Sequence, residues 1–174
     1  MEPIDYFKLQ AKNLLKDYKT RFFNEEEGFY DYKPKYFDVN GIFLYFDIPD
    51  GKEDFTFTLM NAQHTIAKLA GFRNWKDLVN ASPSVLELAR LLYDNAHKIS
   101  LDEWFPYIED AEKMNNTKFD TETKIEILKE VFLKKDLHRS WTTPYRLDLE
   151  KKRYTRPADL EESDYPTSTQ LPQM

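Results

Sequence analysis

Three histidines, His64, His97 and His138, are the side chains best suited to acid–base or metal chemistry near neutral pH. His64 has no metal-binding side chain four residues away on either side, as a helical metal pair would need. His97 stands near Asp94 and Asp102, so a carboxylate–histidine pair can form there, although a histidine close to a helix end is equally ordinary. We therefore predict a structural role for each histidine and no metal site.

The other chemically active residue types do not form a recognisable catalytic or binding motif. The chain has no cysteine, which excludes disulfides, thiolate metal ligands and a cysteine nucleophile. Neighbouring carboxylates such as Asp102 and Glu103 point about 100° apart on a helix, so such a pair does not meet at one substrate. The 4 glycines are well separated and make no phosphate-binding loop. We predict no catalytic residue and no cofactor, and we favour a non-enzymatic protein; an enzyme assembled from distant residues stays open as a third hypothesis.

Aromatic side chains are dense between residues 29 and 57. The β-branched and aromatic run at 42–48, with turn residues on both sides, predicts a strand with short partners on each side, and hence a small antiparallel β-meander at about 36–57. Such a strand is apolar on both faces, so its second face is either covered by the rest of the chain or offered to a partner. The second interpretation gives these candidate partner-binding residues: Tyr30, Tyr32, Phe43, Tyr45, Trp141 and Tyr145.

The remaining elements are predicted to be helices. Apolar residues at three- and four-residue spacing predict a first helix at about 4–22, and capping residues open further helices from residue 58 onward. A last helix is expected from Thr143-Pro144 to about Tyr154. The fold class is thus α+β and mainly α. We expect one domain at 1–154, with the β insertion at 36–57, and a flexible tail at 155–174.

A nucleic-acid-binding accessory protein is the alternative function. Two expected helices at 58–80 superficially suit a helix-turn-helix. The cations that could serve it are Arg73, Lys76, Lys151, Lys152 and Arg153. The formal net charge of −6 opposes binding to a phosphate backbone, so this alternative is disfavoured.

Length and composition limit the remaining classes. A chain of 174 residues with 41% hydrophobic residues can bury a core without a metal or disulfide. It begins without a signal-peptide pattern and has no apolar run long enough to span a membrane. We therefore predict a soluble cytoplasmic protein that does not use a membrane. The leading hypothesis is an interaction or regulatory protein that binds another protein, or a second copy of itself, through an aromatic surface.

Two segments, 4–21 and 58–82, resemble a helical leader module of bacterial proteins. The first carries Lys8-Leu9-Gln10-Ala11-Lys12; the second carries Asn61-Ala62-Gln63 and then Gly71-Phe72 with Trp75. In the module, a lysine-rich helix precedes an alanine–glutamine helix that ends in glycine-phenylalanine-x-x-tryptophan, often ahead of ankyrin-repeat or glyoxalase-like domains. The resemblance implies a bacterial origin and an uncharacterised family. It assigns no catalytic residue, and the aromatic insertion at 22–57 departs from the module.

Overall fold

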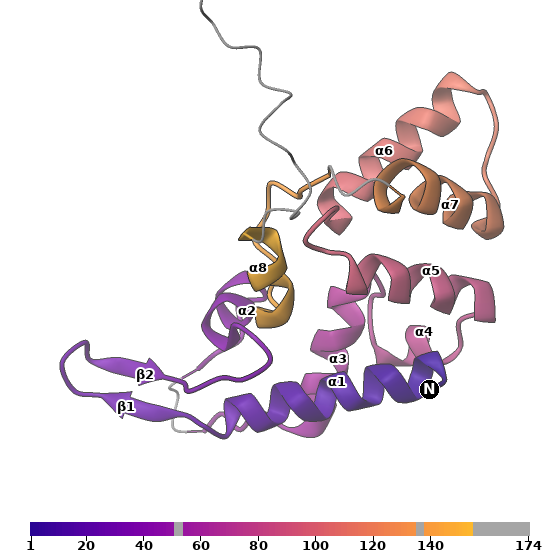
Figure 1. Cartoon of the computed structure of the whole chain (residues 1–174). Coiled ribbons are helices and arrows are strands. Elements are labelled where there is room, and N and C mark those ends of the chain that lie inside the picture. The colour runs from indigo at the N-terminus through magenta and orange to yellow at the C-terminus, as the bar shows by residue number, and fades with distance from the viewer. Residues whose placement is uncertain (51–53, 135–137, 155–174) are drawn as a thin grey trace, which may run out of the picture.

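Helices arranged around two apolar clusters form most of the computed structural model, which describes residues 1–50, 54–134 and 138–154 (Figure 1). The elements follow one another as α1 (Pro3–Tyr18), β1 (Phe22–Asn24), β2 (Phe29–Asp31), α2 (Val39–Tyr45), α3 (Leu59–Leu69), α4 (Trp75–Val79), α5 (Pro83–Asp94), α6 (Leu101–Met114), α7 (Thr121–Ile127), the π-helix η1 (Leu128–Leu133) and α8 (Leu147–Tyr154). This confirms the predicted fold class, mainly helical with a small antiparallel sheet. The predicted tail at 155–174 lies outside the described residues.

The larger cluster lies where α1 packs against α3 and α5. Phe7, Ala11 and Leu14 form one buried stripe of α1, at the helical spacing seen in the sequence. They meet Ala62, Ile66 and Ala67 of α3 and several buried residues of α2 and α5. Asp17 is buried at the end of the same stripe. Its carboxylate accepts hydrogen bonds from the backbone N–H groups of residues 35, 36 and 37, which fixes the chain that leads into α2.

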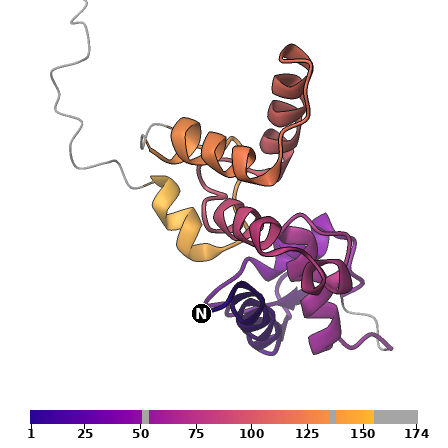
Figure 2. The ribbon, with the colours of Figure 1, turned by 90° about the vertical axis from the view of Figure 1, so that its right-hand side faces the viewer.

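The smaller cluster joins α6, α7 and η1 to the end of α5. Its buried members are Leu92, Ile99, Trp104, Ile108, Leu128 and Phe132. Figure 2 shows α6 and α7 on the side of α5 that faces away from α1. Because α5 supplies residues to both clusters, it is the central helix of the molecule. No helix among the described residues is long and apolar enough to cross a membrane.

The predicted β-meander at 36–57 is wrong. Residues 39–45 form α2, and the two strands lie earlier, at 22–24 and 29–31. Asp38 caps α2, since its Oδ1 accepts from the Gly41 N–H at 2.9 Å. Val39, Ile42 and Phe43 then share one buried face while Leu44 is exposed. This is the period of a helix rather than the alternation of a strand.

Candidate functional site

The segment from residue 140 to 149 crosses from one apolar cluster to the other, and two carboxylates hold it. The first is Glu103, which closes a capping box at the start of α6 by accepting from the Ser100 N–H at 2.8 Å. The same side chain accepts from the Ser140 hydroxyl at 2.6 Å and from the Trp141 N–H at 3.3 Å. Burial raises the pKa of Glu103, but the hydrogen bonds from Ser140, Ser100 and Trp141 outweigh it, so the pKa lies below its ordinary value. The helix cap thus also anchors the start of the segment.

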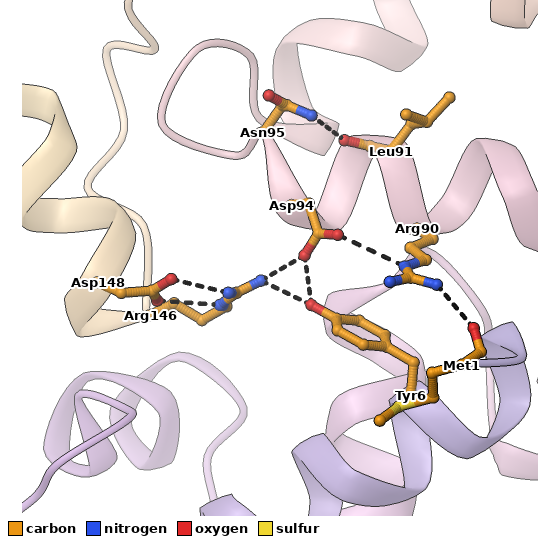
Figure 3. A network of polar contacts seen from close by, with 8 residues as sticks. All are labelled: Met1, Tyr6, Arg90, Leu91, Asp94, Asn95, Arg146 and Asp148. Atoms are coloured by element: carbon orange, nitrogen blue, oxygen red, sulfur yellow. Dashed lines mark hydrogen bonds and ion pairs between the residues drawn. The ribbon is translucent and has the colours of Figure 1, made fainter.

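The second anchor is a polar network around Arg146 (Figure 3). One guanidinium nitrogen, Nη1, donates to Asp94 of α5 at 2.7 Å and to the Tyr6 hydroxyl of α1 at 3.0 Å, while Nη2 donates to Asp148 at 2.8 Å. Tyr6 also donates to Asp94, which closes the triangle. Arg90 extends the network, because it lies 3.6 Å from Asp94 and donates to the Met1 carbonyl at 3.1 Å. Three elements distant in sequence are therefore held at one point.

The network also fixes protonation states. Burial lowers the pKa of Arg146, but the nearby Tyr93, Tyr6 and Asp94 outweigh it, and the pKa lies above its ordinary value. Burial, and next the hydrogen bond to Asp94, raise the pKa of Tyr6. Arg146 is therefore charged and Tyr6 neutral at any ordinary pH. The network is an ion pair that a neutral phenol completes.

Backbone pairing aligns the same segment with the chain that precedes α2. The Asp38 N–H donates to the Tyr145 carbonyl at 2.8 Å, and the Leu147 N–H donates to the Tyr36 carbonyl at 2.9 Å. Phe37 and Arg146 form the isolated antiparallel bridge between these two bonds. The Tyr145 ring consequently lies beside α2, with its centroid 5.5 Å from that of Tyr45.

Between the two anchors lies a pocket of about 290 Å³. Its wall is mainly apolar and is built from the ends of α2, α3 and α5, the start of α6 and the anchored segment. The lining residues include Tyr45, Phe46, Lys68, Leu69, Tyr93, Ala96, Leu101, Asp102, Trp141, Pro144, Tyr145 and Arg146. The volume is near the lower end for ligand sites and suits one large side chain or a short peptide segment.

Three of the predicted partner-binding residues, Tyr45, Trp141 and Tyr145, line this one pocket. Trp141 is 71% exposed and Tyr45 is 56% exposed, so both rings are open to a partner. Tyr32 and Phe43 are buried in the larger cluster and are not offered at the surface. Tyr30 lies apart in β2, where the Arg21 guanidinium carbon stands 4.1 Å from its ring centroid. The structure brings together half of the predicted set.

Sequence reasoning missed two polar side chains of the pocket. Lys68 places its ammonium 5.6 Å from the Phe46 ring centroid and makes no ion pair within the described part of the chain. The Tyr93 hydroxyl is buried without a hydrogen-bond partner among the described residues. Burial raises the pKa of Tyr93, so the phenol stays neutral. No local pattern marks either residue, because only the tertiary fold brings α3 and α5 to this pocket.

The histidines lie in separate places. His64 accepts from the Trp75 N–H through Nδ1 at 3.2 Å and so connects the start of α4 to α3. His97 is buried, and its carbonyl accepts from the Ser140 N–H at 2.9 Å. His138 is exposed, with its ring centroid 4.9 Å from that of Phe132. Within residues 1–50, 54–134 and 138–154, no group of three or more His, Cys, Asp or Glu side chains is placed to hold a metal ion.

The candidate nucleic-acid contacts do not form one surface. Arg73 and Lys76 are exposed beside α4, where Arg73 lies 3.6 Å from Asp77. Lys151 and Lys152 are exposed on α8, which Figure 1 shows well apart from α4, and the side chain of Arg153 lies outside the described part. The expected recognition helix is the five-residue α4.

Comparisons with protein-family models, with curated proteins and with solved structures find no match to this chain. The resemblance of residues 4–21 and 58–82 to the bacterial leader module therefore stays a prediction.

Proposed function

We propose that this protein is a non-enzymatic interaction protein that binds another protein through the pocket around Trp141. The observation that carries the proposal is the convergence of Tyr45, Trp141 and Tyr145, from distant parts of the chain, on one accessible apolar pocket. Tryptophan and tyrosine are enriched among the residues that dominate binding energy at protein interfaces, because they combine a large apolar surface with a polar tip.

The pocket has the composition of an interface centre. Its apolar wall is bordered by the charged side chains of Lys68, Asp102 and Arg146, of which Arg146 is already paired with Asp94. An apolar centre with a polar rim is the usual arrangement at protein interfaces. The partner we propose is a peptide segment that inserts one apolar side chain between the Trp141 and Tyr145 rings. A carboxylate on that segment would pair with Lys68.

Trp141 supplies a direct test. The chain has 3 tryptophans, and Trp104 is buried while Trp141 is exposed. The difference in acrylamide quenching between the wild type and a Trp141→Phe variant therefore reports on this pocket. Occupation by a partner should lower the quenching of the wild type and leave the variant unchanged.

The partner is sought by affinity capture from the native cells, with and without nuclease. Capture by the wild type should be lost in Trp141→Ala and in Tyr45→Ala, and retained in Met114→Ala, whose exposed side chain is at the far end of α6. If all four chains capture the same proteins, the pocket is not the binding surface.

Loss of partners on nuclease treatment would favour the nucleic-acid alternative, which low-salt fluorescence anisotropy with DNA and RNA tests directly.

A further inference from the structure

The β1–β2 hairpin extends beyond the helices, on the side of the molecule opposite α6 and α7 (Figure 1). Its register pairs Phe22 with Asp31, Phe23 with Tyr30 and Asn24 with Phe29. The turn is well defined, because the Asn24 carboxamide oxygen accepts from the Glu26 N–H at 3.1 Å and the Asn24 carbonyl accepts from the Gly28 N–H at 2.8 Å. Gly28 has a φ of 73°, which glycine adopts without strain.

Within the described part of the chain, nothing covers several apolar side chains and the backbone edges of the hairpin. Phe22, Phe23 and Phe29 are 38%, 53% and 48% exposed. Phe22 and Phe29 share one face, and Phe23 packs edge-on against Tyr30 on the other, with ring centroids 5.4 Å apart. No third strand joins this sheet within the described residues. A two-stranded sheet is marginally stable alone, and its free edges are templates for another strand.

The two strands differ in how free their edges are. Near β2, the Asp31 carboxylate accepts from the Asn40 side chain of α2 at 3.0 Å. At the base, Arg21 lies 2.9 Å from Asp50 and stacks on Tyr30, so the hairpin is fixed to the body. Figure 1 shows β1 on the outer side of the hairpin, away from α2. Among the residues that the structure describes, the open edge is therefore that of β1.

The charge on the hairpin is opposite at its two ends. The turn carries Glu25 and Glu27, and the base carries Lys19 and Lys33. All four side chains are exposed, and none of the ion pairs among the described residues uses them. The Lys33 ammonium lies 5.3 Å from the Phe22 ring centroid, which places a positive charge at the β1 side of the base.

We propose that β1 pairs antiparallel with β1 of a second copy of this chain, which joins two hairpins into a four-stranded sheet around a two-fold axis at Phe23. An antiparallel two-fold arrangement places the turn of each hairpin beside the base of the other. The turn of each copy, with Glu25 and Glu27, then lies beside the base of the other, which carries Lys19, Arg21 and Lys33. The two Phe23 rings lie side by side across the axis. The hairpin is thus complementary to itself in charge.

The contact is small compared with a standard protein interface, so the dimer should be weak and should depend on concentration. Sedimentation velocity from micromolar to near-millimolar concentration, at low and at high salt, measures it. The wild type should dimerise at the upper concentrations in low salt, and salt should weaken the dimer because the exposed charges are screened. A wild type that stays monomeric throughout overturns the proposal and leaves β1 free for a strand of a different protein.

Charge-reversal variants distinguish a loss of dimer pairing from a loss of folding. E25K/E27K and K19E/K33E should each raise the dimer dissociation constant by about tenfold or more, since like charges then face each other. An equimolar mixture of the two variants should restore the dimer, as should one chain carrying all four changes. E122K/E126K and K12E/K16E change the same number of charges at exposed sites elsewhere and should leave the dimer unchanged.

Failure of the mixture to dimerise would overturn the proposed pairing even if each variant alone is monomeric. The Trp141→Ala variant should dimerise like the wild type, because the pocket and the hairpin are separate surfaces. The dimer and the pocket-binding function can thus fail independently.

Discussion

The guanidinium of Arg146 donates to the carboxylate of Asp94 at 2.7 Å and joins two residues 52 positions apart in sequence. The Arg146 side chain is only 16% exposed. This pair ties the segment that forms the pocket to the central helix α5. The pocket therefore depends on a contact made outside its aromatic wall.

Replacement of Asp94 by alanine should remove the main anchor of this segment. Arg146 would remain partly buried with only Asp148 as a carboxylate partner, and we expect the free energy of unfolding to fall by about 1–3 kcal/mol. Urea denaturation followed by circular dichroism measures the change. Asp5→Ala is the matched control, because the Asp5–Lys8 pair is exposed at both ends and its loss should change stability by less than about 0.5 kcal/mol. Equal effects of the two substitutions would contradict the anchoring role.

Glu103→Gln should loosen the 140–149 segment at its N-terminal end, opposite to the end that Arg146 anchors. Ser100 and Ser140 donate to one carboxylate oxygen and Trp141 to the other, whereas a glutamine amide has only one acceptor oxygen, so it loses at least one of these bonds and keeps the rest in weaker form. We expect faster amide hydrogen exchange in residues 140–145 and stronger acrylamide quenching of Trp141. Glu109→Gln is the control on the same helix, since Glu109 forms an exposed ion pair with Lys113. Unchanged exchange in 140–145 would show that Glu103 does not hold this segment.

The sequence predicted the features that depend on neighbouring residues alone, such as helix caps. Capping residues predicted helices from residue 58 onward, and Thr58, Asn74, Ser82 and Asp120 cap helices there, because a cap needs only neighbouring residues. It did not predict the pocket, since Lys68 and Tyr93 carry no local mark of their contact with the 140–149 segment. Tyr45, Trp141 and Tyr145 were found by residue type alone, from a hypothesis that placed Tyr45 on a strand.

The error at 39–45 has a physical reason. Ile42, Phe43 and Phe46 favour strands by residue type, but propensity on a half-buried surface depends on context. The Asp38 cap and the helical spacing of Val39, Ile42 and Phe43 favour a helix instead. The burial of Val39, Ile42 and Phe43 follows a helical period, and this burial depends on packing against distant parts of the chain, such as Tyr18 and Phe57 around Phe43.

Two neighbouring substitutions in α2 test whether residues 39–45 form a helix with one buried face. Phe43 is 5% exposed and packs against Phe57 at a centroid distance of 4.9 Å, whereas Leu44 is 85% exposed. Phe43→Ala should lower the free energy of unfolding by about 3–5 kcal/mol through the cavity it leaves. Leu44→Ala should change it by less than about 0.5 kcal/mol. Thermal or urea denaturation distinguishes them, and comparable losses would mean that Leu44 is buried too.

Acid should weaken the junction between α6 and α7 through Glu112. Its buried carboxylate accepts from the Lys118 ammonium at 2.6 Å and from the Phe119 N–H at 3.1 Å, with Lys124 at 3.4 Å. The Lys118 hydrogen bond, helped by Phe119 and Lys124 and opposed by burial, lowers the pKa of Glu112 from 4.5 to about 2.

Because the pKa of Glu112 is lower in the folded chain than in the unfolded one, its stabilising contribution is fully present above the unfolded value of 4.5 and is lost as pH falls toward about 2. Glu112→Gln should therefore be less stable than the wild type at neutral pH, and the difference should shrink as pH falls through this range. Urea denaturation midpoints at intervals between these pH values measure it. Glu126→Gln, at an exposed position of α7, should keep the pH dependence of the wild type. A constant difference between Glu112→Gln and the wild type would mean that Glu112 acts by packing and not by its charge.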